Sequence, residues 1–411
     1  NEINVKRIEQ LSHFVKMKTN RRSLVMIFYG YCFELPDPKS GHCCLDELLK
    51  SENIDLLASP ISYQDRAQGG MLAYMAPVDS VMKNGKLWMV EDDTRTFLAV
   101  DKTEEDASFN AYIESKEDTF EIHKRNMASI IRRGLGVWFM DLWASGWLKD
   151  RELWDNIGNL YRLYKDYKKT MEPFKPDVAF IIDEKSHYYL ENPWKYGNKI
   201  AYEQQKSIYR SGVDFGLYLQ SDLMYDNIPE CKLYVFLNAF SINDEYRKAI
   251  NKLKKNNAVL LWVYGPDIYN NKSAFEVTGI NLSYHNEKIL SKIIQNDGTE
   301  AGDDDEIEPF YSINDNDAEI LGYYKNSAFA AFGIKRNKDH VSVFYGNIQL
   351  SMKIIRKVAK IANVKIYSTD DDVIDSGEII SIHTSSNGTK KIFTENVLLN
   401  VLSGEKHKPH E

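Results

Sequence analysis

The residues best suited to do chemistry form an acidic triplet, Glu91-Asp92-Asp93, directly after the expected strand Lys86–Val90. In a β-strand, alternate side chains point to opposite faces, so Leu87, Met89 and Glu91 share one face and Asp92 lies on the other. A carboxylate at the end of such a strand can reach a ligand bound at the sheet edge. The alternative is a solvated acidic loop, or a triplet that pairs with Arg95.

Cysteine and histidine spacing indicates neither a metal site nor a disulfide framework. The four cysteines, Cys32, Cys43, Cys44 and Cys231, contain no CxxC pair. Histidines such as His42, His123 and His187 show no metal-ligand spacing, so we read them as structural. We therefore expect a protein without a metal or cofactor.

The elements that must position Glu91 alternate between strands and helices over residues 1–171. A helix over 5–18 is followed by apolar strands at 24–29, 54–58, 86–90 and 137–140, with helices at 45–50, 119–133 and 152–170. This alternation predicts parallel βαβ units, with polar and aromatic residues after each strand. In a β/α barrel that strand edge carries the active site, but a barrel needs eight units and about half are present.

A second α/β block begins near residue 178. Strands are expected at 178–183, 216–219, 231–237, 259–263 and 340–346, with helices at 203–211, 244–256 and 349–362. This pattern predicts a doubly wound, flavodoxin-like sheet. From about residue 367 the period changes, and 379–384 with 391–393 predict a hairpin around Asn387-Gly388 in a small β domain.

Composition excludes two classes of protein. The net charge of -8 gives no basic face for nucleic acid. No apolar run reaches about 18 residues, so we expect no membrane-spanning helix. Scattered thiols suit a reducing compartment, which favours a cytoplasmic protein, although an N-terminal signal could precede residue 1.

Several motifs together resemble strands five to eight of the barrel in glycoside hydrolase family 42. The matching segments are Tyr29-Gly30-Tyr31, Ser59–Tyr63, Gly85–Thr96 and Gly136–Leu142. Residues 172–368 resemble the β-galactosidase trimerisation domain, whose fold is similar to class I glutamine amidotransferases. Residues 369–411 resemble the small β-sandwich that ends those enzymes. The resemblance implies an α/β fold: a partial (β/α)8 TIM barrel over 1–171, a flavodoxin-like domain and a small β-sandwich.

The resemblance also assigns roles to residues. Glu91 holds the position of the family's nucleophile, and Tyr63 matches a tyrosine after strand six that hydrogen-bonds to it. Asp141, Trp143, Trp147 and Arg95 are the remaining expected substrate-binding residues. In the family the acid/base Glu follows an Asn after strand four; Asn1-Glu2 matches the pair of residues but not its context, and Glu34 is a weaker candidate. We expect the acid/base to lie upstream of residue 1.

The implied function is a retaining exo-β-glycosidase, similar to β-galactosidases in carbohydrate metabolism, which acts on an oligosaccharide or β-glycoside as a homotrimer. A β-mannosidase, or another β-glycosidase of this architecture, is the alternative within the class. A non-catalytic carbohydrate-binding or assembly protein is the alternative outside it. An amidotransferase would need a Cys on a sharp turn after a strand, but Cys231 precedes its strand and Asn238 follows it.

Overall fold

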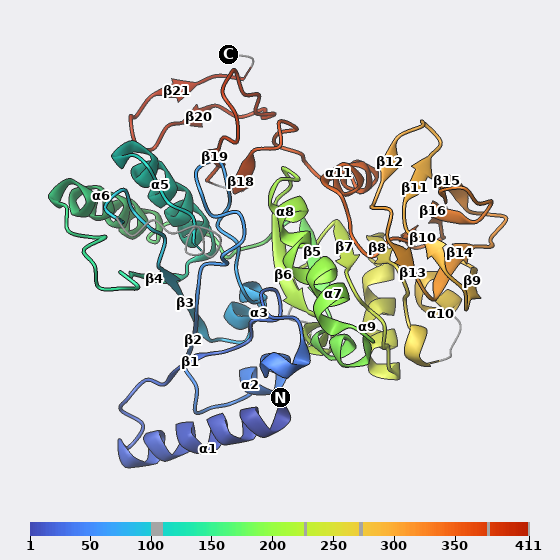
Figure 1. Ribbon diagram of the computed structural model, residues 1–411, viewed down its shortest axis with the longest axis horizontal. Coiled ribbons are helices and arrows are strands. Elements are labelled where there is room, and N and C mark those ends of the chain that lie inside the picture. The colour runs from blue at the N-terminus through green and yellow to red at the C-terminus, as the bar shows by residue number, and fades with distance from the viewer. Residues whose placement is uncertain (100–109, 226–227, 271–273, 376–378, 410–411) are drawn as a thin grey trace.

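A four-stranded parallel sheet forms the first part of the chain (Figure 1). The computed structural model describes residues 1–99, 110–225, 228–270, 274–375 and 379–409. The strands follow in chain order: β1 (Met26–Phe28), β2 (Leu56–Pro60), β3 (Leu87–Asp92) and β4 (Gly136–Phe139). Because all neighbouring pairs are parallel, the carboxyl ends of the four strands meet at one edge.

The helices of this part are α1 (Glu2–Lys18), α2 (Leu45–Leu49), α3 (Val78–Lys83), α5 (Lys116–Arg133) and α6 (Arg151–Tyr167). Local signals fix the ends of the long helix α5. The Ser115 hydroxyl accepts a hydrogen bond from the backbone N–H of Asp118, and Gly134 ends the helix in the left-handed region at φ 69°. The parallel strand and helix pattern expected for this region is therefore present.

The second sheet has nine strands in the order β12-β11-β15-β16-β17-β8-β7-β5-β6 (Figure 1). Its parallel strands are β5 (Val178–Ile182), β6 (Phe215–Leu219), β7 (Leu233–Phe236), β8 (Val259–Val263) and β17 (Val341–Tyr345). Its helices are α7 (Pro193–Gly197), α8 (Gln204–Tyr209), α9 (Asp244–Lys254), α10 (Ala274–Thr278) and α11 (Met352–Ile361). The strands β5, β6, β7 and β8 are buried along their whole length, as apolar runs in a doubly covered sheet should be.

An antiparallel extension of this sheet was not expected from the sequence. Here β17 pairs with β16 (Ala330–Arg336), which continues through β15 (Glu319–Tyr324) and β11 (Ile293–Gln295) to β12 (Glu300–Ala301). Two short ladders lie beside it: β9 (Leu282–His285) with β14 (Phe310–Ile313), and β10 (Ile289–Leu290) with β13 (Glu306–Ile307). The strands β9 to β14, of two to four residues each, carry too little periodicity to be recognised in the sequence, whereas β15 and β16, with six and seven residues, are long enough and were missed.

Helix α3 joins the two sheets along the edge strand β6. The Asp79 carboxylate accepts the backbone N–H of Leu217 at 2.7 Å, and the Ser80 hydroxyl accepts that of Leu219 at 2.7 Å. These side chains satisfy donors that an edge strand leaves unpaired. Arg133 of α5 lies 3.4 Å from Asp79, which ties the first sheet's helix layer to the same contact.

The hairpin predicted around Asn387-Gly388 is wrong. Instead, β19 (Ser381–His383) pairs with the preceding strand β18 (Val373–Asp375), and the backbone N–H of Phe393 donates to the carbonyl of Tyr367. A further short ladder joins β20 (Leu398–Leu399) to β21 (Lys406–His407). This C-terminal segment runs over α5, where β19 contacts that helix (Figure 1). None of the helices in the described ranges combines the length and the apolar composition that a membrane span requires.

Candidate functional site

Glu91 lies near the carboxyl end of β3, between Pro60 of β2 and Trp138 of β4. Its neighbour Asp92 accepts a hydrogen bond from the Asn126 amide of α5 at 2.9 Å, so the Asp92 face of the strand is the one that helices cover. Strand alternation then directs Glu91 to the opposite face, which it shares with the half-buried Leu87 and Met89.

A buried cluster stands beside Glu91. The Tyr63 hydroxyl donates to Asp93 Oδ2 at 2.9 Å, and Arg66 forms an ion pair with the other oxygen of Asp93. The Arg66 guanidinium also lies 4.7 Å from the centroid of the Tyr63 ring. Asp93 therefore fixes both Tyr63 and Arg66 close to the end of β3.

The charge state of Glu91 depends on this cluster. Burial raises the pKa of the Glu91 carboxyl, the negative charge of Asp93 raises it further, and Arg66 opposes both effects. In the part of the chain that the structure describes, the Glu91 carboxylate has no hydrogen bond and no ion pair, although the residue is only 7% exposed. Its oxygens are thus available to an incoming group.

The loop after β4 places Asp141 and Trp143 differently from Trp147. Although burial acts to raise it, the pKa of Asp141 is lowered by backbone N–H donors, among them those of Gly146 at 2.6 Å and Trp147 at 2.9 Å. Asp141 therefore closes its own loop, while the Trp143 side chain is 56% exposed beside it. The resemblance assigns Asp141 to sugar hydroxyls, but backbone N–H groups of its own loop already occupy most of its acceptor capacity.

Trp147 and Arg95 are interior residues, each 2% exposed. The Arg95 guanidinium lies 5.5 Å from the Trp147 ring and 4.1 Å from the Tyr112 ring. The expectation that Trp147 and Arg95 contact substrate does not fit this burial. The cation–π contact between the Arg95 guanidinium and the aromatic rings accounts for a buried arginine beside a buried tryptophan.

Asn1 and Glu2 lie at the start of helix α1. Glu2 is an exposed residue in the first turn of α1, and Asn1 bonds to the loop at Pro38 and Cys43. This placement does not fit an acid/base role for Glu2. Glu34, by contrast, follows β1 at the same sheet edge as Glu91, and its Oε1 accepts the backbone N–H of Tyr63 at 3.2 Å.

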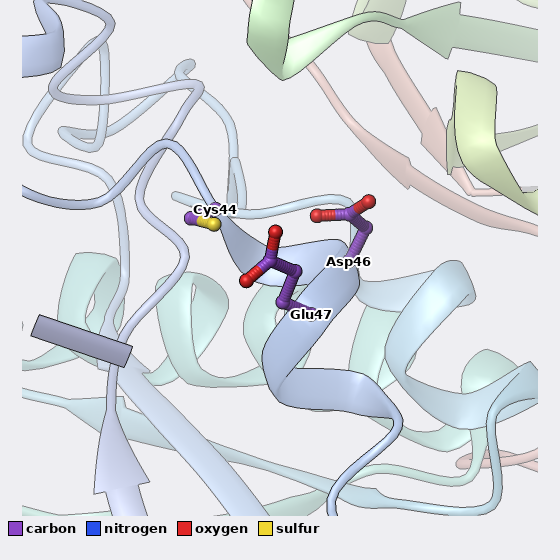
Figure 2. Close-up of side chains that lie close together, drawn as sticks. All are labelled: Cys44, Asp46 and Glu47. Atoms are coloured by element: carbon purple, nitrogen blue, oxygen red, sulfur yellow. The ribbon is translucent and has the colours of Figure 1, made fainter. Parts of the chain in front are cut away.

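In the described part of the chain, one side-chain group, at the start of α2, has the spacing of a cation site. Cys44, Asp46 and Glu47 offer ligand atoms within 4.8 Å of one another (Figure 2). However, the Lys185 ammonium lies 3.3 Å from Asp46, and burial raises the pKa of the Cys44 thiol to about 12. Lys185 thus balances the charge of Asp46, and the Cys44 thiol stays protonated, so the group needs no bound cation.

Sequence reasoning missed Arg66 and Asp93 as partners of Tyr63. Asp93 was visible as part of the acidic triplet, but nothing in the spacing of residues 63, 66 and 93 indicated that they meet. Adjacent parallel strands end side by side at one edge of a sheet. Tyr63 and Arg66 follow β2 and Asp93 follows β3, so their positions after neighbouring strands could have suggested that they meet.

The fold is similar to that of solved glycoside hydrolases. No protein-family model matches the sequence, and no curated protein matches it. The family 42 β-galactosidase of G. stearothermophilus aligns with a TM-score of 0.60 at 10% identity, over 89% of this chain and 58% of that one. A β-galactosidase of Bacillus circulans sp. alkalophilus gives 0.53 at 8% identity, over 89% and 63%.

An exo-β-1,4-mannosidase of an Opitutaceae bacterium gives a TM-score of 0.52 at 10% identity, over 88% of this chain and 69% of that one. At such identities the likeness concerns the fold alone. The chain spans just under three-fifths of the length of the G. stearothermophilus enzyme. The chain thus has a fold like that of the family 42 β-galactosidases, with parallel α/β sheets that resemble part of their structure.

Proposed function

We propose that this chain is part of a retaining β-glycosidase, similar to β-galactosidases, in which Glu91 is the nucleophile. One observation carries the proposal: the Glu91 carboxylate, which has no partner among the described residues, lies near the end of β3, on the face away from the helices, beside the Tyr63–Asp93–Arg66 cluster. The likeness in fold to glycoside hydrolases supports it.

In this proposal Glu91 attacks the anomeric carbon and forms a covalent glycosyl-enzyme, which water then hydrolyses. Attack requires the ionised carboxylate. Arg66 favours that form, while Asp93 and burial oppose it. A second carboxyl group must protonate the departing oxygen and then activate the water. We propose that this acid/base lies in a segment preceding residue 1, since Glu2 is part of α1.

We further propose that the chain has three domains, at 1–171, 172–368 and 369–411. The parallel strands of the second sheet follow the order β6-β5-β7-β8-β17, which is the 2-1-3-4-5 order of flavodoxin-like sheets. This order supports a flavodoxin-like second domain, which we propose assembles the protein as a trimer. The third would be a small β domain, and the protein would be cytoplasmic.

The test uses a substrate that does not need the acid/base. When Glu91 attacks the anomeric carbon of a dinitrophenyl 2-deoxy-2-fluoro-β-galactoside, the bond to the aglycone breaks, the dinitrophenolate departs without protonation, and the fluorosugar stays bound to the nucleophile. Mass spectrometry of peptides should place that sugar on Glu91. The Glu91→Gln protein should remain unlabelled, while the exposed control Glu152→Gln on α6 should label like the wild type. Labelling at another carboxylate would contradict the assignment.

A mannosidase is the second candidate, because the solved neighbours include an exo-β-1,4-mannosidase. The corresponding fluoromannoside distinguishes the two sugars at the same carboxylate. If neither sugar labels the folded protein, but sugars still bind to it, the non-catalytic carbohydrate-binding alternative is favoured.

A further inference from the structure

An aromatic cavity of about 330 Å³ lies at the carboxyl edge of the nine-stranded sheet, formed by segments that follow its parallel strands. Segments after β5 and β7 meet there, and the strand order β6-β5-β7-β8-β17 reverses between these two strands. Open α/β sheets bind ligands at such a point, outside the carboxyl ends of the strands. The aromatic and acidic residues of the lining are Tyr189, Glu191, Tyr196, Phe240, Tyr264, Tyr269, Tyr284 and Glu308.

Four of the rings form a connected wall. Tyr189 and Tyr269 lie with their ring centroids 4.8 Å apart. Phe240 meets Tyr269 edge-on at 6.1 Å and Tyr264 edge-on at 5.7 Å. Hydrogen bonds hold two of these rings in place, because the Tyr269 hydroxyl donates to the carbonyl of Tyr189 at 3.2 Å and the Tyr264 hydroxyl donates to that of Pro309. The wall is therefore fixed by contacts between segments that follow three different strands.

The cavity opens to solvent through its tyrosines. Tyr189, Tyr284 and Tyr269 are 60%, 52% and 39% exposed, whereas Phe240 lies beneath them at 1% exposure. Neighbouring exposed rings leave apolar surface that a ligand can cover. A small molecule can thus reach the rings without a change in the fold.

The charge of the lining defines the class of ligand. Glu191 and Glu308 are exposed, and neither carboxylate forms an ion pair or a hydrogen bond with the described residues. Among those residues, the lining includes no Lys, Arg or His. The Lys195 ammonium lies 5.4 Å from the centroid of the Tyr196 ring, but it is paired with Asp305, which is outside the lining, at 3.7 Å. Two carboxylates without a partner disfavour a phosphate or carboxylate ligand and favour a cation.

The rings distinguish an organic cation from an inorganic one. An aromatic ring attracts a positive charge over its face, and groups of rings bind quaternary ammonium ions in this way. The methyl groups of such an ion also bury apolar surface against the rings, which a hydrated metal ion does not.

We propose that this cavity binds a small organic cation of the quaternary ammonium class. The rings of Tyr189, Tyr269 and their neighbours would surround its methyl groups, and Glu191 and Glu308 would balance its charge. The cavity shares no residue with the cluster around Glu91, so this ligand site goes beyond the proposed glycosidase function and does not depend on it.

The test measures the binding of choline to the purified chain by calorimetry and by saturation-transfer NMR of the choline methyl protons. The comparison ligand is the uncharged alcohol in which carbon replaces the quaternary nitrogen of choline. It keeps the shape and the apolar contacts but loses the charge. We expect choline to bind and the uncharged alcohol to bind at least about tenfold more weakly.

Variants of the lining separate the effect of the rings from that of the charge. Tyr269→Ala removes one ring and should weaken choline binding about tenfold, whereas Tyr269→Phe keeps the ring and should bind within about threefold of the wild type. The double change Glu191→Gln with Glu308→Gln removes the negative charge and should weaken binding about threefold or more.

Matched controls lie on the helices of the first sheet. Tyr161→Ala removes a tyrosine of α6 that is 55% exposed. The double change Glu121→Gln with Glu152→Gln removes two charges from α5 and α6, where these side chains are 52% and 71% exposed. Both controls should bind choline like the wild type.

Circular dichroism and thermal unfolding establish that each variant is folded. The inference is overturned if choline does not bind the folded wild type at millimolar concentration, or if the uncharged alcohol binds equally well. Unchanged binding in either Tyr269→Ala or the double variant of Glu191 and Glu308 overturns it as well. Fluorosugar labelling of Glu91 is a separate readout, so a failure of the glycosidase proposal would leave the result for this cavity unaffected.

Discussion

The ion pair between Arg66 and Asp93 gives the sharpest prediction about stability. Both side chains are almost fully buried, at 1% and 0% exposure. The Nε and Nη1 atoms of Arg66 have no hydrogen-bond partner in the described part of the chain, so Asp93 is its main compensation. The change Asp93→Asn keeps the shape of the side chain and removes that charge.

Removing one partner of a buried pair leaves an uncompensated charge in the interior and costs about 3–5 kcal/mol. Asp93→Asn should therefore lower the free energy of unfolding by about that amount. For a cooperative unit of roughly 150–250 residues, such a loss corresponds to a fall of roughly 6–20 °C in melting temperature. Urea unfolding followed by tryptophan fluorescence and calorimetric melting would measure both quantities.

Two further variants test whether the loss of stability comes from the uncompensated charge of Arg66. The double change Arg66→Met with Asp93→Asn removes both charges, and it should be more stable than Asp93→Asn alone. Asp155→Asn is the control, because Asp155 forms an exposed ion pair. Its carboxylate lies 4.0 Å from Arg151, and the side chains of Arg151 and Asp155 are 94% and 72% exposed. This change should alter the free energy of unfolding by at most about 0.5 kcal/mol. A loss below about 1 kcal/mol in Asp93→Asn, or no recovery in the double variant, would show that the charge of Arg66 is compensated elsewhere.

Three further predictions concern the pH dependence of labelling, the cap of α5 and the proposed assembly. Attack needs the ionised carboxylate, and burial together with the charge of Asp93 raises the pKa of Glu91, so labelling by the fluorosugar should fall with acid at a pH above the usual carboxylate value of about 4.3. Asp93→Asn removes the smaller of these two causes, so a pH series of labelling rates should show the acid limb at lower pH. Ser115→Ala removes the cap of α5 and should cost about 1 kcal/mol in urea unfolding, and an unchanged stability would mean that the cap is not used in solution. Light scattering of the intact protein should report three times the monomer mass if residues 172–368 assemble it, and a monomer at micromolar concentration would contradict the proposed trimer.

Strand alternation and apolar runs were enough to predict much of the backbone. Apolar runs at 24–29, 54–58, 86–90 and 137–140 correspond to β1, β2, β3 and β4, and those of the second block to its five parallel strands. Alternation also separated Glu91 from Asp92, which the bond from Asn126 to Asp92 bears out. These features depend on a residue's near neighbours along the chain, and so periodicity records them.

Turn chemistry was less reliable near the C-terminus. Asn387-Gly388 is a common pair at hairpin turns, but β19 pairs with the preceding strand β18 and not with a strand after the turn. A preceding strand of matching length and an apolar pair, Ile374 opposite Ile382, outweighed the local preference for a turn. Short-range signals decide where a chain can turn, whereas packing decides which turn forms.

The order of apolar runs along the chain predicts parallel α/β units and a carboxylate at the end of one buried strand. Tertiary structure alone decided what surrounds that carboxylate: Asp93 holds Tyr63 and Arg66 beside it, while Trp147 and Arg95 turn inward. The physical reason is that spacing along a strand fixes the face a side chain takes. Its burial, its charge and its neighbours depend on contacts between segments that are distant in the chain.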